Sequence, residues 1–448
     1  MWNRMIWIAC SFTFISLFLK AQPQDLSLKD CVQYAFEHNH KVRKATLEIQ
    51  KAGHRLEELK SQALPQISLE SDLQYFPQLP TNILTGDFQQ GTEQTLATQF
   101  GRNINFNTGL EFSQLLYKKG RKLGEQATQQ LDQINQLQLT RTQEELAFEI
   151  AKLYYQAQLV RQKKGLLTAN LEQVNGLMTL LEKQLANGFV KKIDVDQVSV
   201  KKSNLESRQY QLELQYNKLM QVLKYQMAMP LDAPINLSDT ITETTYELPS
   251  PDGEPVDFKS KTAVSLLQTQ VAINDLQIEH IRAGFGPTLF FKGAYNLQAL
   301  ADGFGDFGRS GTWFHYGFLG LQLQQPIFDG NKKKAQMAQK AIETQQIREE
   351  QAFVEASLEL QHNNAQQAIR INLSQLETLD KTRQVAEAVY EVAQKRFSQG
   401  IAPITELLSA DAARQEAQTN YLAALLQLKI AELELQYARG TLLTTLLQ

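Results

Sequence analysis

Two long stretches of this chain contain no proline, and most of the second also contains no glycine. No proline occurs at positions 81–229 or 327–402, and no glycine occurs at positions 331–399. Both residues are unfavourable inside helices. Between Gly120 and Gly188 there is room for about 67 residues of continuous helix, or roughly 100 Å at 1.5 Å per residue. A helix of that length does not belong to a compact globular core.

An apolar seam runs along the first of these predicted helices. Twelve positions from 146 to 185 alternate spacings of four and three, and Lys164 is the one residue among them that is not apolar. This spacing is typical of a coiled coil. We therefore expect Leu153, Leu171 and Leu181 to be buried. The equivalent frame in the second half, from Ala365 to Phe397, is weaker.

The two halves of the chain repeat each other. Gly188 is followed six residues later by Asp194, and Gly400 is followed six residues later by Glu406. A period near 210–220 residues is too long for a solenoid, so it indicates one internal duplication. Five of the twelve prolines lie between positions 230 and 255 and predict a linker between the halves.

Four segments of about ten residues alternate apolar and polar side chains. This period of two is typical of a barrel strand between lipid and a watery lumen. An antiparallel sheet packed on a soluble core is the alternative. The four predicted strands cover about 65–77, 101–117, 286–300 and 312–327.

The fourth predicted strand is less regular than the others. Its leucines lie on one face, and Phe314, Tyr316 and Phe318 lie on the other. A bulge or an interfacial aromatic girdle would each explain this pattern. The polar, glycine-rich connections 77–101 and 299–312 are predicted to be exposed loops.

Four strands are too few to close a barrel, for which about eight are needed. The mature chain also has no apolar run of 18 residues or more, so it could cross a membrane only with strands. A chain that contributes four amphipathic strands to a membrane must share the barrel with copies of itself. The sequence therefore predicts an obligate oligomer.

The first 21 residues are predicted to be a secretory signal peptide, because Arg4 precedes an apolar core and Ala21 precedes a polar start. Lipidation at Cys10 is a less favoured alternative. Cleavage would leave Cys31 as the one cysteine, hence no internal disulfide. It would also reduce the 45 basic residues to 43 against 48 acidic ones, a balance that argues against nucleic acid as a partner.

The predicted organisation is mainly α with a membrane β-barrel portion. The segments after the leader are a first repeat at 22–229 with a long helical hairpin at 119–228, a linker at 230–258, a second repeat at 259–440 with a hairpin at 330–440, and a tail at 441–448.

No residue pattern indicates an enzyme, a cofactor or a metal centre. The six histidines are scattered, and no pair stands with a carboxylate at the spacing of a metal site. A periplasmic coiled-coil adaptor or scaffold and a secreted hydrolase are the competing functions. Adaptors carry one helical hairpin, whereas two are predicted here, and no nucleophile–base arrangement supports a hydrolase.

Several landmarks resemble the TolC-type outer-membrane efflux protein family. The segment from Leu26 to His40 is similar to the family's opening helix, and Leu64-Pro65, the Pro326–Gly330 segment and the two glycine turns are similar to further landmarks. The resemblance implies a homotrimer with a 12-stranded barrel in outer-membrane lipid and a long periplasmic helical barrel. It implies an export duct of a tripartite efflux or type I secretion system. The implied partners are a periplasmic adaptor (membrane fusion) protein and an inner-membrane efflux pump or ABC exporter.

The resemblance also implies a pore constriction at the hairpin ends. Carried over by position, Asp194 and Glu406 are the acids that narrow the pore, and Asp196 could supply charge as well. Gly188 and Gly400 mark the tip turns. Three copies of each acid would favour cations at a narrow mouth. The alternative is that these acids only stabilise helix ends.

Overall fold

The computed structural model describes residues 24–89, 92–239, 257–309 and 311–447. The predicted signal peptide lies outside these residues. The chain forms two compact units. Of the described residues, the hairpin unit comprises 24–44, 140–239, 257–261 and 356–447, and the sheet unit comprises 45–89, 92–139, 262–309 and 311–355.

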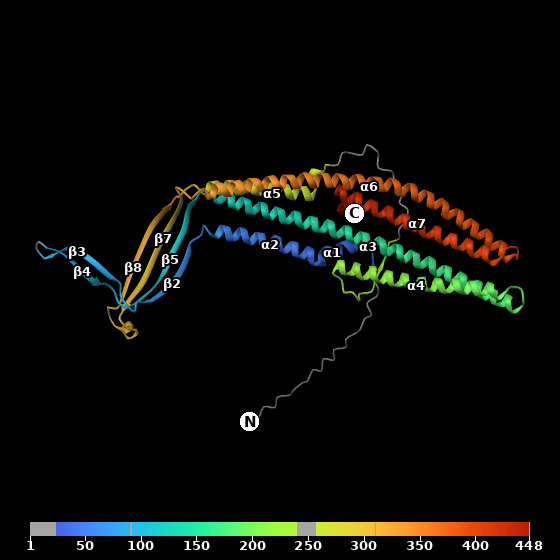
Figure 1. Ribbon diagram of the computed structural model, residues 1–448, viewed down its shortest axis with the longest axis horizontal. Helices are drawn as coiled ribbons and strands as arrows, with labels where there is room; N and C mark the ends of the chain where they lie inside the picture. Colours follow the sequence, from blue (N-terminus) through green and yellow to red (C-terminus); the bar gives the residue numbers. More distant parts are fainter. Residues whose placement is uncertain (1–23, 90–91, 240–256, 310, 448) are drawn as a thin grey trace, which may run out of the picture. The chain divides into compact units, whose positions relative to one another are not determined.

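Four long helices form two helical hairpins, as the absence of helix breakers predicted (Figure 1). In the first half α3 (Arg121–Ala186) contains 66 residues and is followed by α4 (Lys192–Met227). In the second half α6 (Lys332–Ser398) contains 67 residues and is followed by α7 (Ile404–Arg439). The expected helical duplication is confirmed.

The predicted seam of α3 is mostly buried. Of its eleven apolar positions, eight are buried, including Leu171 and Leu181. Leu153 is only half-buried, so the expectation for this residue was too strong. Lys164, the polar exception, forms an ion pair with Glu213 on α4. The seam therefore joins the two helices of the hairpin by packing and by this one pair.

The opening helix predicted from the N-terminal landmark is divided at Asn39. Helix α1 (Leu28–His38) begins with a capping box, in which the Ser27 side chain and the Asp30 carboxylate each accept a backbone N–H. At the break, the Asn39 carboxamide donates to the Gln226 carbonyl oxygen at 2.6 Å and accepts from the Lys41 N–H at 2.7 Å. The chain then continues as α2 (His40–Ser61).

The remaining helices are shorter. Helix α5 (Thr262–Ala283) opens the second repeat and α8 (Leu442–Leu447) follows α7. Two 3-10 helices occur, η1 (Phe258–Ser260) and η2 (Phe304–Gly308). None of the helices in the described part of the chain is long and apolar enough to cross a membrane.

A short parallel pair of strands ties the start of the chain to the proline-rich segment. Strand β1 (Gln24–Leu26) pairs with β6 (Ile235–Leu237). Beside it, the Asp239 carboxylate accepts from the Leu28 N–H at 2.9 Å and from the Tyr154 hydroxyl at 2.8 Å. Part of the segment predicted as a linker is therefore ordered against helix α3.

The sheet unit contains an antiparallel sheet in the order β2-β5-β7-β8. Strands β2 and β8 form its two edges, and neither pairs with a further described strand. All four predicted strands are present. They are β2 (Gln66–Tyr75), β5 (Ile104–Lys118), β7 (Thr288–Ala301) and β8 (Trp313–Gln324).

The connection 77–101 is not simply a loop. It contains an antiparallel hairpin of β3 (Thr81–Gln89) and β4 (Thr92–Gln99). The sequence of this segment shows no regular alternation of apolar and polar residues, so the pattern did not reveal these strands. The other predicted loop, 299–312, contains η2.

The register of the sheet separates two faces. Residues directly opposite each other in antiparallel strands lie on the same side, so Leu69, Leu110, Tyr295 and Gly317 share one face, which we call the apolar face. The other, the polar face, carries Ser68, Glu70, Asp72, Asn105, Asn107, Glu111, Lys292, Asn296 and Gln298.

The register also explains the irregular fourth strand. The leucines of β8, such as Leu319 opposite Gly293, lie on the apolar face, whereas Phe314, opposite Gln298, lies on the polar face. No bulge interrupts the pairing of β7 with β8. The three aromatics of β8 therefore belong to the polar face.

Candidate functional site at the hairpin ends

The two glycine turns have the same local structure. Gly188 has φ +76° and Gly400 has φ +73°, in the left-handed region that favours glycine. In each turn the glycine N–H donates to the carbonyl three residues back, and the next N–H donates to the carbonyl five residues back, with N–O distances of 2.9–3.0 Å. This double bond pattern is a Schellman motif, which ends a helix. The sequence repeat thus produces a repeated turn.

The predicted constriction acids begin the returning helices. Asp194 lies in the first turn of α4, where its carboxylate accepts from the Lys191 N–H at 3.0 Å. Glu406 lies in the first turn of α7 and forms an ion pair with Arg396 of α6 at 2.7 Å. Asp196 is exposed. Asp194 therefore stabilises the start of its helix, and the charge of Glu406 is partly neutralised by Arg396 across the turn.

Arg396 was not singled out from the sequence. The position where the family resemblance suggests a base holds Ala402, which is buried at 7% exposure. Arg396 lies four residues before Gly400 and reaches Glu406 across the turn. The sequence does place a basic residue ten positions before the acid, on the other side of the glycine turn. Only the folded turn, however, brings the two side chains into contact.

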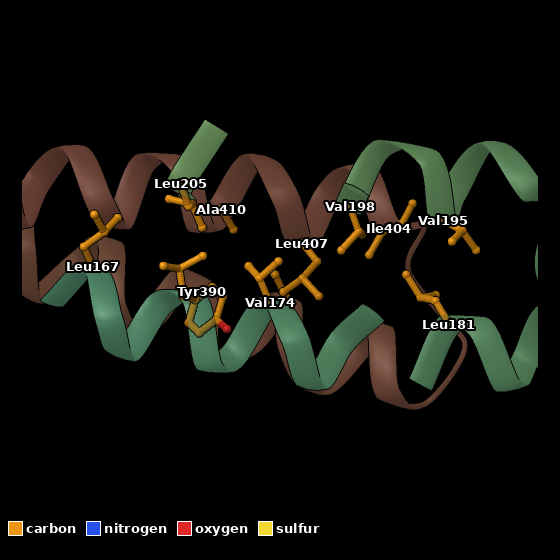
Figure 2. Close-up of a cluster of buried hydrophobic side chains, with 12 residues drawn as sticks. Leu167, Val174, Leu181, Val195, Val198, Leu205, Tyr390, Ile404, Leu407 and Ala410 are labelled. Carbon is orange, nitrogen blue, oxygen red and sulfur yellow. The ribbon is translucent and has the colours of Figure 1, made fainter. Parts of the chain in front are cut away.

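Behind the turns, the two hairpins pack on a shared apolar cluster (Figure 2). Each of the four long helices contributes to it, and the side chains point toward a common interior. The buried members are Leu167, Leu171, Val174, Leu181, Val195, Val198, Leu205, Tyr390, Ala393, Ile404, Leu407 and Ala410. This packing connects the helices that carry the two tip turns within the hairpin unit.

A buried polar cluster interrupts this apolar interior. Asp411 of α7 accepts from Lys201 of α4 and, at 2.8 Å, from Arg414 of α7. The side chains of Asp411 and Arg414 are 9% and 7% exposed, so both charges are largely removed from water. We call Lys201, Asp411 and Arg414 the charged triad. It links the first hairpin to the second.

Arg414 makes several further contacts. Its guanidinium donates to the Asn170 and Gln173 side-chain oxygens of α3 at 2.9 and 3.0 Å, and it stacks over the Tyr390 ring of α6 at 4.1 Å. Burial raises the pKa of the Tyr390 hydroxyl. One arginine thus contacts three of the four long helices, including its own. This arrangement satisfies the guanidinium without water.

The charged triad was missed from the sequence. Asp411 and Arg414 stand three apart on a predicted helix, a spacing that usually marks a solvated surface pair. Only their burial between hairpins, with Lys201 some 210 positions away, distinguishes them. A cavity of about 260 Å³ lined by Lys201, Tyr390 and Asp411 lies beside the triad.

Within the described residues, no group of three or more His, Cys, Asp or Glu side chains is arranged to hold a metal ion. At the hairpin ends, Asp194 accepts a backbone hydrogen bond and Glu406 forms an ion pair, and the helices behind the turns pack on one apolar cluster.

The fold is shared with solved outer-membrane channels. The VceC protein of Vibrio cholerae superposes with a TM-score of 0.68 at 15% identity, covering 92% of this chain and 96% of that chain. The CmeC channel of Campylobacter jejuni gives 0.71 at 12% identity over 92% and 85%. The open state of the MtrE channel of Neisseria gonorrhoeae gives 0.68 at 15% over 92% and 88%.

Sequence comparison matches a smaller part of the chain than the comparison of folds does. No curated protein sequence matches the chain. The family described as outer membrane efflux protein matches residues 263–441, which contain all but the first residue of α5 and the whole of β7, η2, β8, α6 and α7. The second half of the chain therefore matches the outer membrane efflux protein family, and the described chain as a whole shares the fold of solved outer-membrane channels.

Proposed function

We propose that this protein is an outer-membrane export channel built by three copies of the chain. The observation that carries the proposal is the four-stranded sheet with one apolar face, one polar face and two open edges. An open edge in lipid leaves backbone groups without partners, at a cost of several kcal/mol each. Pairing β8 of one copy with β2 of the next removes every edge, and three copies give twelve strands.

The channel conducts passively and depends on partners for energy. The long hairpins extend the duct into the periplasm and present their turns to a periplasmic adaptor. An inner-membrane pump or ABC exporter delivers the cargo. The family match and the shared fold support this assignment.

The assembly is tested by native mass measurement in a mild non-ionic detergent. We expect three copies and, in a planar bilayer, discrete single-channel currents. A well-folded monomer that is soluble without detergent would contradict the proposal and would favour a periplasmic scaffold instead.

We further propose that Asp194 and Glu406 narrow the channel at its periplasmic mouth. Replacing both with alanine should raise single-channel conductance and weaken block by multivalent cations, because six carboxylates leave the three-fold mouth. Glu172, an exposed acid of α3 well before the turn, provides the control. If Glu172→Ala has the same effect as the double variant, or if the double variant conducts like the wild type, Asp194 and Glu406 serve only their helix ends.

A further inference from the structure

Three aromatic side chains form a line on the polar face of the sheet. Phe314, Tyr316 and Phe318 of β8 are 50%, 47% and 56% exposed. No aromatic contact of these rings is found among the described residues. Large exposed rings on a wetted surface are unfavourable unless they contact something. We call them the aromatic stripe.

The surroundings of the aromatic stripe are polar or small. Gln298 lies opposite Phe314, Asn296 opposite Tyr316, and Ala294 opposite Phe318. Large apolar side chains on this face of β7 occur only near its ends, at Phe290 and Leu300. The stripe therefore does not continue the apolar face, and it is not part of a girdle around the lipid side.

Acidic residues share the cross-strand rows of the stripe. Through the register, Asp72 lies in the row of Phe314, Glu70 in the row of Tyr316, and Glu111 in the row of Phe318. With strands about 4.8 Å apart, β5 lies roughly 10 Å from β8. The acids of β2 lie on the opposite edge, which barrel closure would bring beside the β8 of the next copy.

In these rows the charged side chains of the polar face are all negative. The rows contain three carboxylates and no cation, and Lys292 lies one row further along, opposite Gly320. Ring faces attract cations, and rings also stack on planar groups. Carboxylates raise the local concentration of cations.

We propose that the aromatic stripe is a contact site for cargo, and that the cargo it favours is an organic cation with an aromatic ring. The inference rests on the proposed channel, because it takes the polar face as the lumen. A cation passing along β8 meets a ring at every second residue while the acids balance its charge. A cation without a ring gains the attraction of the rings and the carboxylates but no stacking, and an aromatic anion gains only the stacking.

The test compares three probes in planar bilayers containing wild-type channels. Benzyltrimethylammonium is a cation with a ring, tetramethylammonium is a cation without one, and benzenesulfonate is an anion with a ring. We expect benzyltrimethylammonium to reduce the current at a concentration about two- to tenfold lower than tetramethylammonium, because both cations contact the rings but only the first also stacks a ring on them. Benzenesulfonate should have the weakest effect.

The variant that tests the stripe replaces all three aromatics with threonine, which keeps strand propensity. It should conduct, and the two cations should then block at the same concentration. Gln322→Thr, on the same strand and face, is the matched control and should retain the wild-type difference. If the triple variant does not insert, Tyr316→Thr alone should still reduce the difference.

The outcomes separate the two proposals. A wild-type protein that forms no conducting channel overturns the proposed function and this inference with it. Channels that conduct but are blocked equally by both cations overturn the inference alone. A triple variant that keeps the wild-type difference between the blocking concentrations of the two cations also overturns the inference alone.

Discussion

Replacing Arg414 with methionine removes the cation that lies between Asp411 and the amides of α3. Methionine retains much of the side-chain volume, so the main loss is electrostatic. The Asn170 oxygen, on a residue that is 8% exposed, loses its donor. Asp411 keeps its hydrogen bonds from Lys201 and Gln415 but loses those from Arg414. The stacking on Tyr390 is also lost.

The expected cost of Arg414→Met is about 3 kcal/mol. Breaking a buried ion pair costs roughly 3–5 kcal/mol, and an orphaned buried acceptor costs roughly 1–3 kcal/mol. The ion pair that Lys201 retains with Asp411 reduces the first of these costs. For a cooperative unit of a few hundred residues, this loss lowers the unfolding temperature by on the order of 5–10 °C. Circular dichroism of the helices during heating in detergent measures it.

A control variant and a rescue variant test this prediction further. Lys381→Met removes a cation from an exposed pair with Glu377 on α6, and should leave the unfolding temperature unchanged because water already screens this pair. Replacing the whole charged triad with apolar residues of similar volume should recover most of the lost stability, because no charge is then left buried. An Arg414→Met protein that unfolds at the wild-type temperature, or no more easily than Lys381→Met, would refute the reasoning.

Three further predictions concern the helices. Leu171→Asp should cost several kcal/mol by placing an unpaired charge in the seam, where Leu171 is 8% exposed, and thermal unfolding would detect it. Gly188→Ala should destabilise by about 1 kcal/mol because its φ is positive, whereas Gly165→Ala, inside α3 with open space around the added methyl group, should be neutral or stabilising; equal effects in denaturant titrations would contradict this. Burial lowers the pKa of Lys261 to about 8, so the folded state loses this proton before the unfolded state does and stability should rise with pH above about 8. Lys261→Met should remove that rise in unfolding curves collected from pH 7 to pH 10, and a wild-type curve that stays flat over this range would count against it.

Local pattern in the sequence was sufficient to predict the long helices and the four strands. Helix propensity and the positions of glycine act within a few residues, so Gly188 and Gly400 are enough to locate both turns. Alternation likewise located β2, β5, β7 and β8. The hairpin of β3 and β4 was not predicted because its sequence shows no regular alternation of apolar and polar residues.

Tertiary structure decided which polar residues matter. Asp411 and Arg414 have the spacing of an ordinary surface pair, and only the packing of two hairpins removes them from water beside Lys201. The face of Phe314 could not be read from β8 alone, because both of its faces are apolar and a shift of one residue exchanges them. The pairing with β7 fixed it. Periodicity is a property of neighbours along the chain, whereas burial and register depend on segments some 200 residues apart, and the sequence does not encode those contacts in any local pattern.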